Sequence, residues 1–244
     1  MTPRFFISPD SLRHERVTLD AVVAHQVRHV LRLQAGDTIL LLDNSGWEFE
    51  VELEAVGHDA VSGRVVDRRL AGGEPRLRLT LYQALLKADK FEWVLQKGTE
   101  LGIAVFRPVL AEHCVRGDVS EGRMERWRRI VQEAAEQSRR GRVPSLHEPV
   151  SFAQAAQEAG QSGLSLIAHE QERGQSLRAW LSAHKAAPSL ALFVGPEGGF
   201  SAGEMALAAQ HGLAAVSLGP RILRAETAGL VAASAIFYET GEMG

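Results

Sequence analysis

Cysteine is nearly absent from this chain, with Cys114 the single example among 244 residues. One thiol excludes an internal disulfide and fits a reducing compartment, so we expect a cytoplasmic protein. Long apolar runs and a signal-peptide pattern are also missing, so we expect neither a membrane span nor export. The net charge of −3 argues against a highly basic nucleic-acid coat protein but leaves room for a local basic patch.

Two common nucleotide-binding motifs are missing as well. The chain has neither GxxxxGK followed by Ser or Thr nor a GxGxxG that opens a first βα unit, which argues against P-loop NTPases and ordinary Rossmann dehydrogenases. His25 and His29 have the i, i+4 spacing of metal ligands on a helix. Residue 26 is Gln rather than the Glu of HExxH, and no third ligand suggests itself, so we expect no metal.

The sequence pattern changes at the Gly- and Pro-containing residues 70–75, from short strand-like segments to alternating strand and helix signals. Before this boundary, residues 38–43 form an apolar run, and residues 47–53 alternate apolar and acidic side chains. These two patterns predict a hairpin, with residues 61–66 as a further strand. A helix is expected from about residue 20 to 33, with the apolar positions 22, 23, 27, 30 and 31 facing inward. Residues 1–71 are therefore expected to form a small β-barrel-like domain with one helix.

Strand and helix signals alternate in residues 75–244. Strand patterns cover residues 77–85, 105–111, 164–168, 190–194 and 214–218. Helical patterns cover residues 89–101, 122–138 and 226–238, and Ser151 and Ser201 have capping-box spacing before two further helical segments. This alternation predicts an α/β domain whose mainly parallel sheet is covered on both faces.

Two loops follow apolar runs near the C-terminus and precede helical patterns. The first is GPEGGFS, residues 195–201, and the second is LGPRILRAETA, residues 218–228. Glycine-containing turns at the carboxyl ends of adjacent strands are where open α/β sheets bind ligands, so we expect a small ligand between these loops. The alternative is that the glycines and prolines only mark the ends of strands.

Several motifs occur together and in order. They are PRFF at residues 3–6, HQVRHVLR at 25–32, QALLKADKFEWVLQKGTELG at 83–102, ERWRRIVQEAAEQS at 125–138, and the two loops. Over nearly its whole length the chain resembles the bacterial methyltransferases of the SPOUT superfamily that modify N3 of a uracil in 16S ribosomal RNA. The resemblance implies a PUA-like β-barrel in residues 1–71 and a methyltransferase domain with a trefoil knot in residues 75–244. It also implies S-adenosylmethionine bound in the knot and a homodimer.

Under this resemblance the two loops form the walls of the cofactor site. The adenine ring would need an apolar slot and backbone hydrogen bonds, which Leu218, Ile222 and Leu223 could supply, although plain core packing is the alternative for these three. The expected cofactor-binding residues are Ala168, His169, Gly195, Pro196, Glu197, Gly198, Leu218, Gly219, Ile222, Leu223, Thr227 and Ala228.

Methyl transfer to uracil N3 requires alignment of the reactants and removal of the N3 proton. An arginine in the second loop can stabilise the charge that develops on the uracil oxygens, which favours Arg224 and Arg221. Glu226 could orient an arginine or act as the base. The alternative is a structural ion pair between Arg224 and Glu226 at a helix N-terminus.

Contacts to RNA are expected from arginines. Residues 123–142 hold seven Arg against three Glu, a local net charge of +4. The expected RNA-binding residues are Arg4, Arg28, Arg32, Arg129, Arg139, Arg140 and Arg142. A solvated helix face is the alternative reading of this charge, and Trp127 is expected in the core rather than as a platform for base stacking.

Two other functions remain open at this point. One is a non-catalytic RNA-binding assembly factor, which binding of S-adenosylmethionine would argue against. The other is a methyltransferase of the same superfamily that acts on transfer RNA, which the resemblance of the first domain disfavours.

Overall fold

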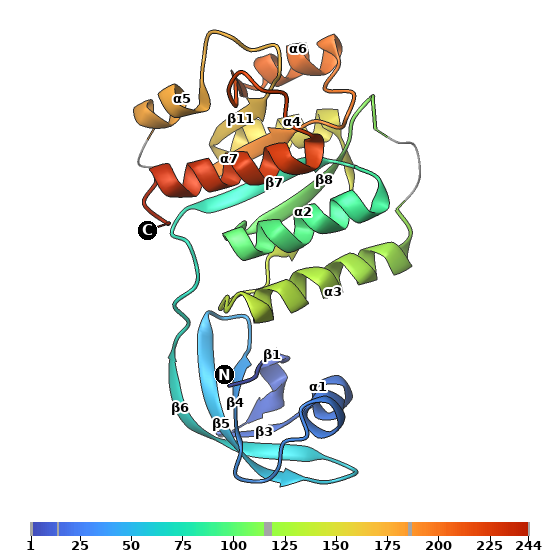
Figure 1. Ribbon diagram of the computed structural model, residues 1–244, viewed down its shortest axis with the longest axis vertical. Helices are drawn as coiled ribbons and strands as arrows, with labels where there is room; N and C mark the ends of the chain where they lie inside the picture. The colour runs from blue at the N-terminus through green and yellow to red at the C-terminus, as the bar shows by residue number, and fades with distance from the viewer. Residues whose placement is uncertain (1, 14, 115–118, 185–186, 244) are drawn as a thin grey trace. The chain divides into compact units, whose positions relative to one another are not determined.

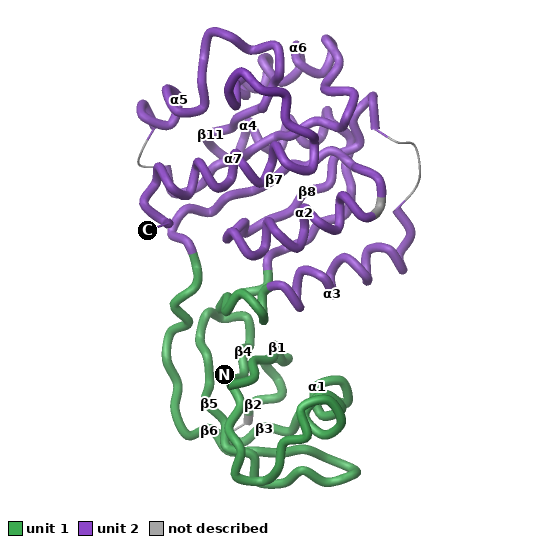
Figure 2. The backbone as a smooth tube through the Cα atoms, in the orientation of Figure 1, with its two compact units in different colours: residues 1–74, 135–143 green, residues 75–134, 144–244 purple. Residues whose placement is uncertain are grey.

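The computed structural model describes residues 2–13, 15–114, 119–184 and 187–243. The chain forms two compact units, one of residues 1–74 with 135–143 and one of residues 75–134 with 144–244 (Figure 2). The boundary follows Glu74, within residues 70–75, where the sequence pattern changes from strand-like to alternating strand and helix signals. The sequence did not predict that the short segment 135–143, with the end of helix α3, belongs to the first unit.

Among its described residues, the first unit is built on a mainly antiparallel sheet of six strands in the order β1-β4-β5-β6-β3-β2, in which only β1 and β4 pair in parallel. Its elements are β1 (Arg4–Phe6), a 3-10 turn (Pro9–Ser11), β2 (Leu12–Arg13), β3 (Arg16–Thr18), α1 (Ala21–His25), a π-helical turn (Gln26–Val30), β4 (Thr38–Leu42), β5 (Trp47–Val56) and β6 (Val61–Leu70). The expected hairpin is confirmed as β4 and β5, and β6 is longer than its apolar pattern.

The helix expected over residues 20–33 differs from the prediction. Asp20 caps it by accepting from the backbone of Val22 and Val23, but the α-helix ends at His25 and continues as one π-helical turn. Val23 and Val27 are buried, whereas Val22, Val30 and Leu31 are exposed. The wider turn moves Val30 and Leu31 off the buried face, and Val22 lies at the start of α1 on the solvent side. The prediction that positions 22, 30 and 31 face inward is wrong.

The second unit contains a parallel sheet in the order β10-β8-β7-β12-β11-β13, with β9 also paired to β8. Its elements are β7 (Arg78–Ala84), α2 (Ala88–Leu101), β8 (Val105–Leu110), α3 (Glu121–Gln137), β9 (Ser145–Leu146), β10 (Val150–Ser151), α4 (Phe152–Ser162), β11 (Leu164–Ala168), α5 (Leu177–Ala183), β12 (Ser189–Val194), α6 (Ala202–Gln210), β13 (Ala214–Val216) and α7 (Ala225–Glu239). The expected α/β architecture is confirmed, and α5 is a helix that the sequence did not predict.

Helices cover both faces of this parallel sheet (Figure 1). Helix α7 packs against α2, α5, β7 and β12 on one face, and α4 packs against α6, β8 and β11 on the other. The core under α4 and α6 is aromatic, with the rings of Tyr82 and Phe193 stacked at 4.3 Å. Trp127 of α3 is fully buried against Phe91, as expected. Such packing fixes the strand ends from which the loops project.

Candidate functional site

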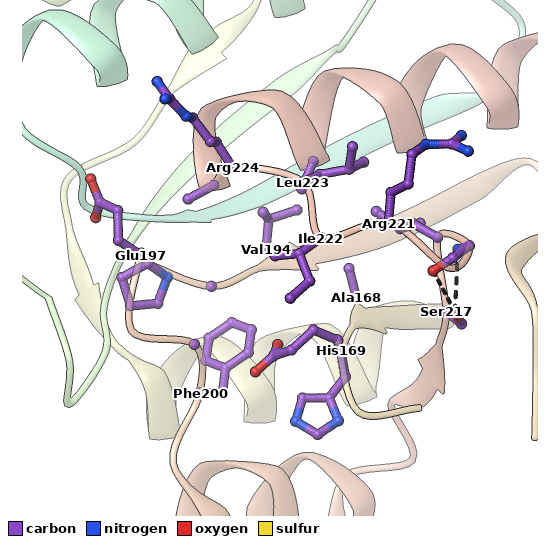
Figure 3. Close-up of a pocket in the computed structure, with 18 of the residues that line it drawn as sticks. Ala168, His169, Val194, Glu197, Phe200, Ser217, Arg221, Ile222, Leu223 and Arg224 are labelled. Atoms are coloured by element: carbon purple, nitrogen blue, oxygen red, sulfur yellow. Dashed lines mark hydrogen bonds between the residues drawn. The ribbon is translucent and has the colours of Figure 1, made fainter. Parts of the chain in front are cut away.

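A cavity of about 490 Å³ lies at the carboxyl ends of β11, β12 and β13, within the range of small-ligand sites (Figure 3). The two loops were expected to follow adjacent strands, but β11 lies between β12 and β13. The loop after β11 therefore forms a third side. The cavity is lined by Ala168, His169, Glu170, Arg173, Val194, Gly195, Pro196, Glu197, Gly198, Gly199, Phe200, Ser217, Leu218, Gly219, Pro220, Arg221, Ile222, Leu223, Arg224, Ala225 and Ala228.

All of the expected cofactor-binding residues except Thr227 line this cavity. Thr227 lies in the first turn of α7, where its backbone N–H donates to Arg224. The sequence missed Glu170 and Arg173 in the loop after β11, and also Val194, Phe200 and Ser217. The one usable signal for Glu170 and Arg173 was their position just after a predicted strand, next to Ala168 and His169.

A backbone hydrogen bond, a helix cap and a contact from His113 fix the conformation of the GPEGGFS loop. The backbone N–H of Gly199 donates to the carbonyl of Pro196, and Ser201 begins α6 with the predicted capping box to Glu204. The His113 ring nitrogen Nδ1 lies 3.0 Å from the carbonyl of Gly198. A Cβ on Gly198 would stand 2.9 Å from that of His113, so only glycine fits there without movement.

The second loop begins with a turn that needs glycine. Gly219 has a φ of +112°, a conformation that L side chains rarely adopt, and its N–H donates to the Ser217 hydroxyl at 3.2 Å. Ile222 is 87% exposed, and its side chain points into the cavity rather than into the core (Figure 3). Core packing is therefore wrong for Ile222.

The same loop presents free backbone donors. Within the described ranges, the N–H groups of Leu218, Ile222 and Leu223 donate to no other backbone or side-chain group. Unpaired amide donors next to apolar side chains are suited to a flat heteroaromatic ring that has acceptor nitrogens on its edge.

The two candidate catalytic arginines lie at the rim. Both Arg221 and Arg224 are exposed, and their side chains point away from the middle of the cavity in Figure 3. Neither forms an ion pair with another residue of the described chain. The alternative in which Arg224 pairs with Glu226 is therefore wrong.

Glu226 instead pairs with a lysine that the sequence did not single out. The Nζ of Lys90, in the first turn of α2, lies 3.3 Å from Glu226 Oε2 and 3.1 Å from Glu197 Oε1. Its hydrogen bond to Glu197 raises the pKa of Lys90 despite partial burial, and Glu226 adds to this effect. Burial alone would raise the pKa of Glu197, but a backbone hydrogen bond and the Lys90 ammonium lower it.

The candidate RNA-binding arginines fall into two groups. Both Arg4 and Arg140 form ion pairs: the partly buried Arg4 pairs with Glu48 at 2.6 Å, and the buried Arg140 pairs with Glu74 at 2.7 Å. A guanidinium that is held in such a pair has fewer donors free for a phosphate, so these pairs favour a structural role for both residues. Their assignment to RNA binding stays a prediction. Arg28 donates to the carbonyls of Gly57 and His58 and is only half-buried. The exposed candidates are Arg32, Arg129, Arg139 and Arg142.

The positive charge of α3 is also partly neutralised. Arg126 pairs with Glu92, Arg128 with Glu148, and Arg129 more loosely with Glu133 at 3.8 Å. The net charge counted from the sequence therefore overstates the free positive charge on this helix.

Neither a metal centre nor a membrane helix is present in the part of the chain that the structure describes. The His25 and His29 rings lie 4.8 Å apart, but no group of three or more His, Cys, Asp or Glu could hold an ion among the described residues. No described helix is both long enough and apolar enough to cross a membrane.

Comparisons with known proteins agree with this architecture. The family described as RNA methyltransferase domain matches residues 73–237. Ribosomal RNA small subunit methyltransferase E of Synechocystis is 36% identical over 97% of this chain and 77% of its own length. The Bacillus subtilis protein of the same name is 34% identical over 97% of this chain and 96% of its own.

A solved structure is similar over the same length. Ribosomal RNA small subunit methyltransferase E from Neisseria gonorrhoeae, bound to S-adenosyl methionine, has a TM-score of 0.89 and 30% identity, and the match covers 98% of each chain. The resemblance stated from the motifs is confirmed: the chain belongs to the family of RNA methyltransferases that includes the ribosomal RNA small subunit methyltransferase E proteins.

Proposed function

We propose that this protein uses S-adenosylmethionine to methylate N3 of one uridine in the 16S RNA of the small ribosomal subunit. The observation that carries the proposal is the cavity formed by the loops after β11, β12 and β13 in a chain of this family. Relatives that match 97% of this chain are named ribosomal RNA small subunit methyltransferases, and a similar protein of that name was solved with S-adenosyl methionine.

The residues of the cavity fit this cofactor. Val194, Ile222 and Leu223 offer an apolar slot for adenine, and the free N–H groups of the second loop can donate to its ring nitrogens. Glycines at 195, 198 and 219 let the backbone approach closely. When bound, the cofactor supplies an electrophilic methyl group.

The uracil that accepts the methyl group needs electrostatic stabilisation. As uracil N3 loses its proton, negative charge spreads onto the two ring oxygens, and a nearby cation stabilises it. We assign this role to Arg224, with Arg221 as a second candidate, because neither is consumed in an ion pair of the described chain. We assign to Glu226 the orientation of the charged groups at the start of α7.

We also propose the finer features of the fold. Residues 1–71 would form a PUA-like barrel that binds RNA, with contacts from Arg32. Arg139 and Arg142 in the segment 135–143 of the same compact unit would add further contacts. Residues 75–244 would form the catalytic domain, in which the C-terminal segment threads a loop as a trefoil knot. Support for the knot comes from the path of the chain, which leaves the edge strand β13 and returns over β7 and β12 as α7.

The exposed face of α7 supports a homodimer. Thr227, Val231, Ala235 and Tyr238 are exposed at helical spacing and leave a largely apolar stripe, with Tyr238 72% exposed. Light scattering at micromolar concentration measures the mass. A ribosomal RNA substrate would place the enzyme in the cytoplasm, and the proposed reaction needs no metal.

The decisive test has two parts. Calorimetry with S-adenosylmethionine should show saturable binding, which the reading as a non-catalytic assembly factor does not require. Mapping of methylated nucleotides in cells with and without the gene should show one N3-methyluridine in 16S RNA that depends on the protein. Loss of a mark on transfer RNA instead would favour the other methyltransferase reading.

A further inference from the structure

Lys90 connects three segments that are far apart in the sequence. It lies in the first turn of α2, and its Nζ contacts Glu197 in the loop after β12 and Glu226 in the first turn of α7. Glu197 lines the cavity, and Glu226 lies between the lining residues Ala225 and Ala228. One ammonium group therefore touches the segments that form two walls of the cavity.

Lys90 neutralises two carboxylates that lie close together in a partly buried place. The Glu226 side chain is only 14% exposed, and its Oε2 is buried without a hydrogen-bond partner among the described residues, so Lys90 is the cation next to it. Glu197 and Glu226 approach the same nitrogen, which brings two carboxylates close together. Without the cation these carboxylates would repel each other in a partly desolvated place. The other charged side chains nearby along these segments are Lys87, Asp89 and Arg224.

We propose that Lys90 is a positioning residue for the cofactor site, where its charge holds the GPEGGFS loop and the start of α7 at the separation that binds S-adenosylmethionine. The inference rests on the proposed function and assigns to α2 a role in a site that α2 does not line. Lys90 acts through Glu197 and Glu226 and does not itself touch the cofactor.

A second lysine on the same helix provides a matched control. Lys97 pairs with Glu100 at 2.7 Å, and its side chain is 33% exposed compared with 30% for Lys90. The Lys97 pair is local, because its partner lies three residues away on the same helix, and such pairs contribute little. A Lys→Met change removes one ion-paired lysine from α2 in both variants.

The experiment measures S-adenosylmethionine binding by calorimetry from pH 3.5 to 8.5 on full-length wild type, K90M, K90R and K97M. K90M should bind about tenfold more weakly at pH 8, the loss expected for a charge-assisted contact. K90R should recover most of the affinity, because it keeps the charge, and K97M should match wild type.

The pH dependence adds a second readout. In the wild type the lowered pKa of Glu197 keeps its carboxylate ionised, so the pairing persists until the pH falls through that lowered value. In K90M this carboxylate should take up a proton at a higher pH. The acid limb of the plot of affinity against pH should therefore move to higher pH. A purely structural role for Lys90 would change the melting temperature but not this limb.

Two outcomes would overturn the proposal. One is wild-type affinity in folded K90M across the pH range, and the other is an equal loss in K97M. If the wild type itself failed to bind S-adenosylmethionine, the proposed function would be wrong. If the wild type bound S-adenosylmethionine and K90M bound it equally well, only the role of Lys90 would be wrong.

Discussion

Arg224 stands directly before α7, as its N-cap residue, with an extended backbone and no side-chain cap. Its exposed guanidinium is free to turn toward a base that enters above the cavity. We predict that Arg224→Ala lowers turnover on saturating RNA by on the order of 10²–10³, or about 3–4 kcal/mol, with little change in cofactor affinity. Single-turnover kinetics and calorimetry measure the two quantities.

Arg178 offers the control for Arg224. It is exposed on α5 and does not line the cavity, so Arg178→Ala should leave both quantities unchanged. Normal turnover in Arg224→Ala would remove Arg224 from the catalytic assignment and leave Arg221 as the remaining candidate.

A comparison of valine substitutions at Gly219 and Gly212 separates the effect of backbone strain on stability from the effect on ligand binding. Gly219 and Gly212 both have positive φ, at +112° and +78°, and a Cβ at either would meet nothing within 4 Å. Valine at either position should therefore cost a similar amount of stability, about 1–2 kcal/mol. Only Gly219 lines the cavity, so we predict that Gly219→Val alone weakens cofactor binding, as measured by calorimetry on the folded variants. Equal affinities in the two variants would count against the second loop as a wall of the site.

At the scale of elements, β5 depends on a buried carboxylate. The Glu48 side chain is 7% exposed between Arg4 and Arg69. Burial would raise the pKa of Glu48, but the hydrogen bonds from Arg69 and Arg4 outweigh it and lower the pKa below 4.5. This contribution to stability is therefore present above pH 4.5 and is lost as the pH falls through the lowered pKa.

We predict that Glu48→Gln reduces the free energy of unfolding by about 3 kcal/mol at pH 7, because two arginines lose their buried partner. The variant should also lose stability less steeply than the wild type below pH 4.5. Urea unfolding from pH 3 to 7 measures both effects. Glu52→Gln on the same strand is the control, since Glu52 pairs with Arg64 at 3.7 Å with both side chains about half exposed. A loss in Glu52→Gln as large as in Glu48→Gln would refute this account.

Strand β5 and helix α1 show where sequence patterns succeed and fail. The alternation in residues 47–53 predicted a strand correctly, but register shifts in β5 and the two arginines place Glu48 inside and leave Trp47 40% exposed. A period of 3.6 residues predicted the first helix, but a π-helical turn exposes Val30 and Leu31. Hydrophobic periodicity assumes ideal geometry, so it cannot anticipate a bulge or a wider turn.

At the scale of the whole molecule, the order of strands limited the prediction of the site. The two glycine-containing loops were found from sequence because their turn chemistry is local. The insertion of β11 between β12 and β13 depends on crossover connections, which leave no periodic signal, so Glu170 was missed. Lys90 was missed for the same reason, since it meets Glu197 across 107 residues of sequence.

Two neighbouring arginines test which part of the basic segment binds RNA. The sequence treats Arg139 and Arg140 alike, but Arg139 is exposed, whereas Arg140 is buried against Glu74. We predict that Arg139→Ala weakens RNA binding and lowers the slope of log affinity against log salt by about 1, with unchanged stability. Filter binding across a salt series and thermal unfolding measure the two effects.

Arg140→Ala should do the opposite. Removal of one partner from a buried ion pair costs about 3–5 kcal/mol, because the other charge is left in place without its counter-ion. Glu74 keeps its hydrogen bonds from the backbone N–H groups of Gly141 and Arg142, so the loss should fall toward the lower end of that range. The variant that remains folded should bind RNA with the wild-type salt slope. A reduced salt slope in folded Arg140→Ala, or a wild-type slope in Arg139→Ala, would show that burial does not separate the structural arginines from those that contact phosphate.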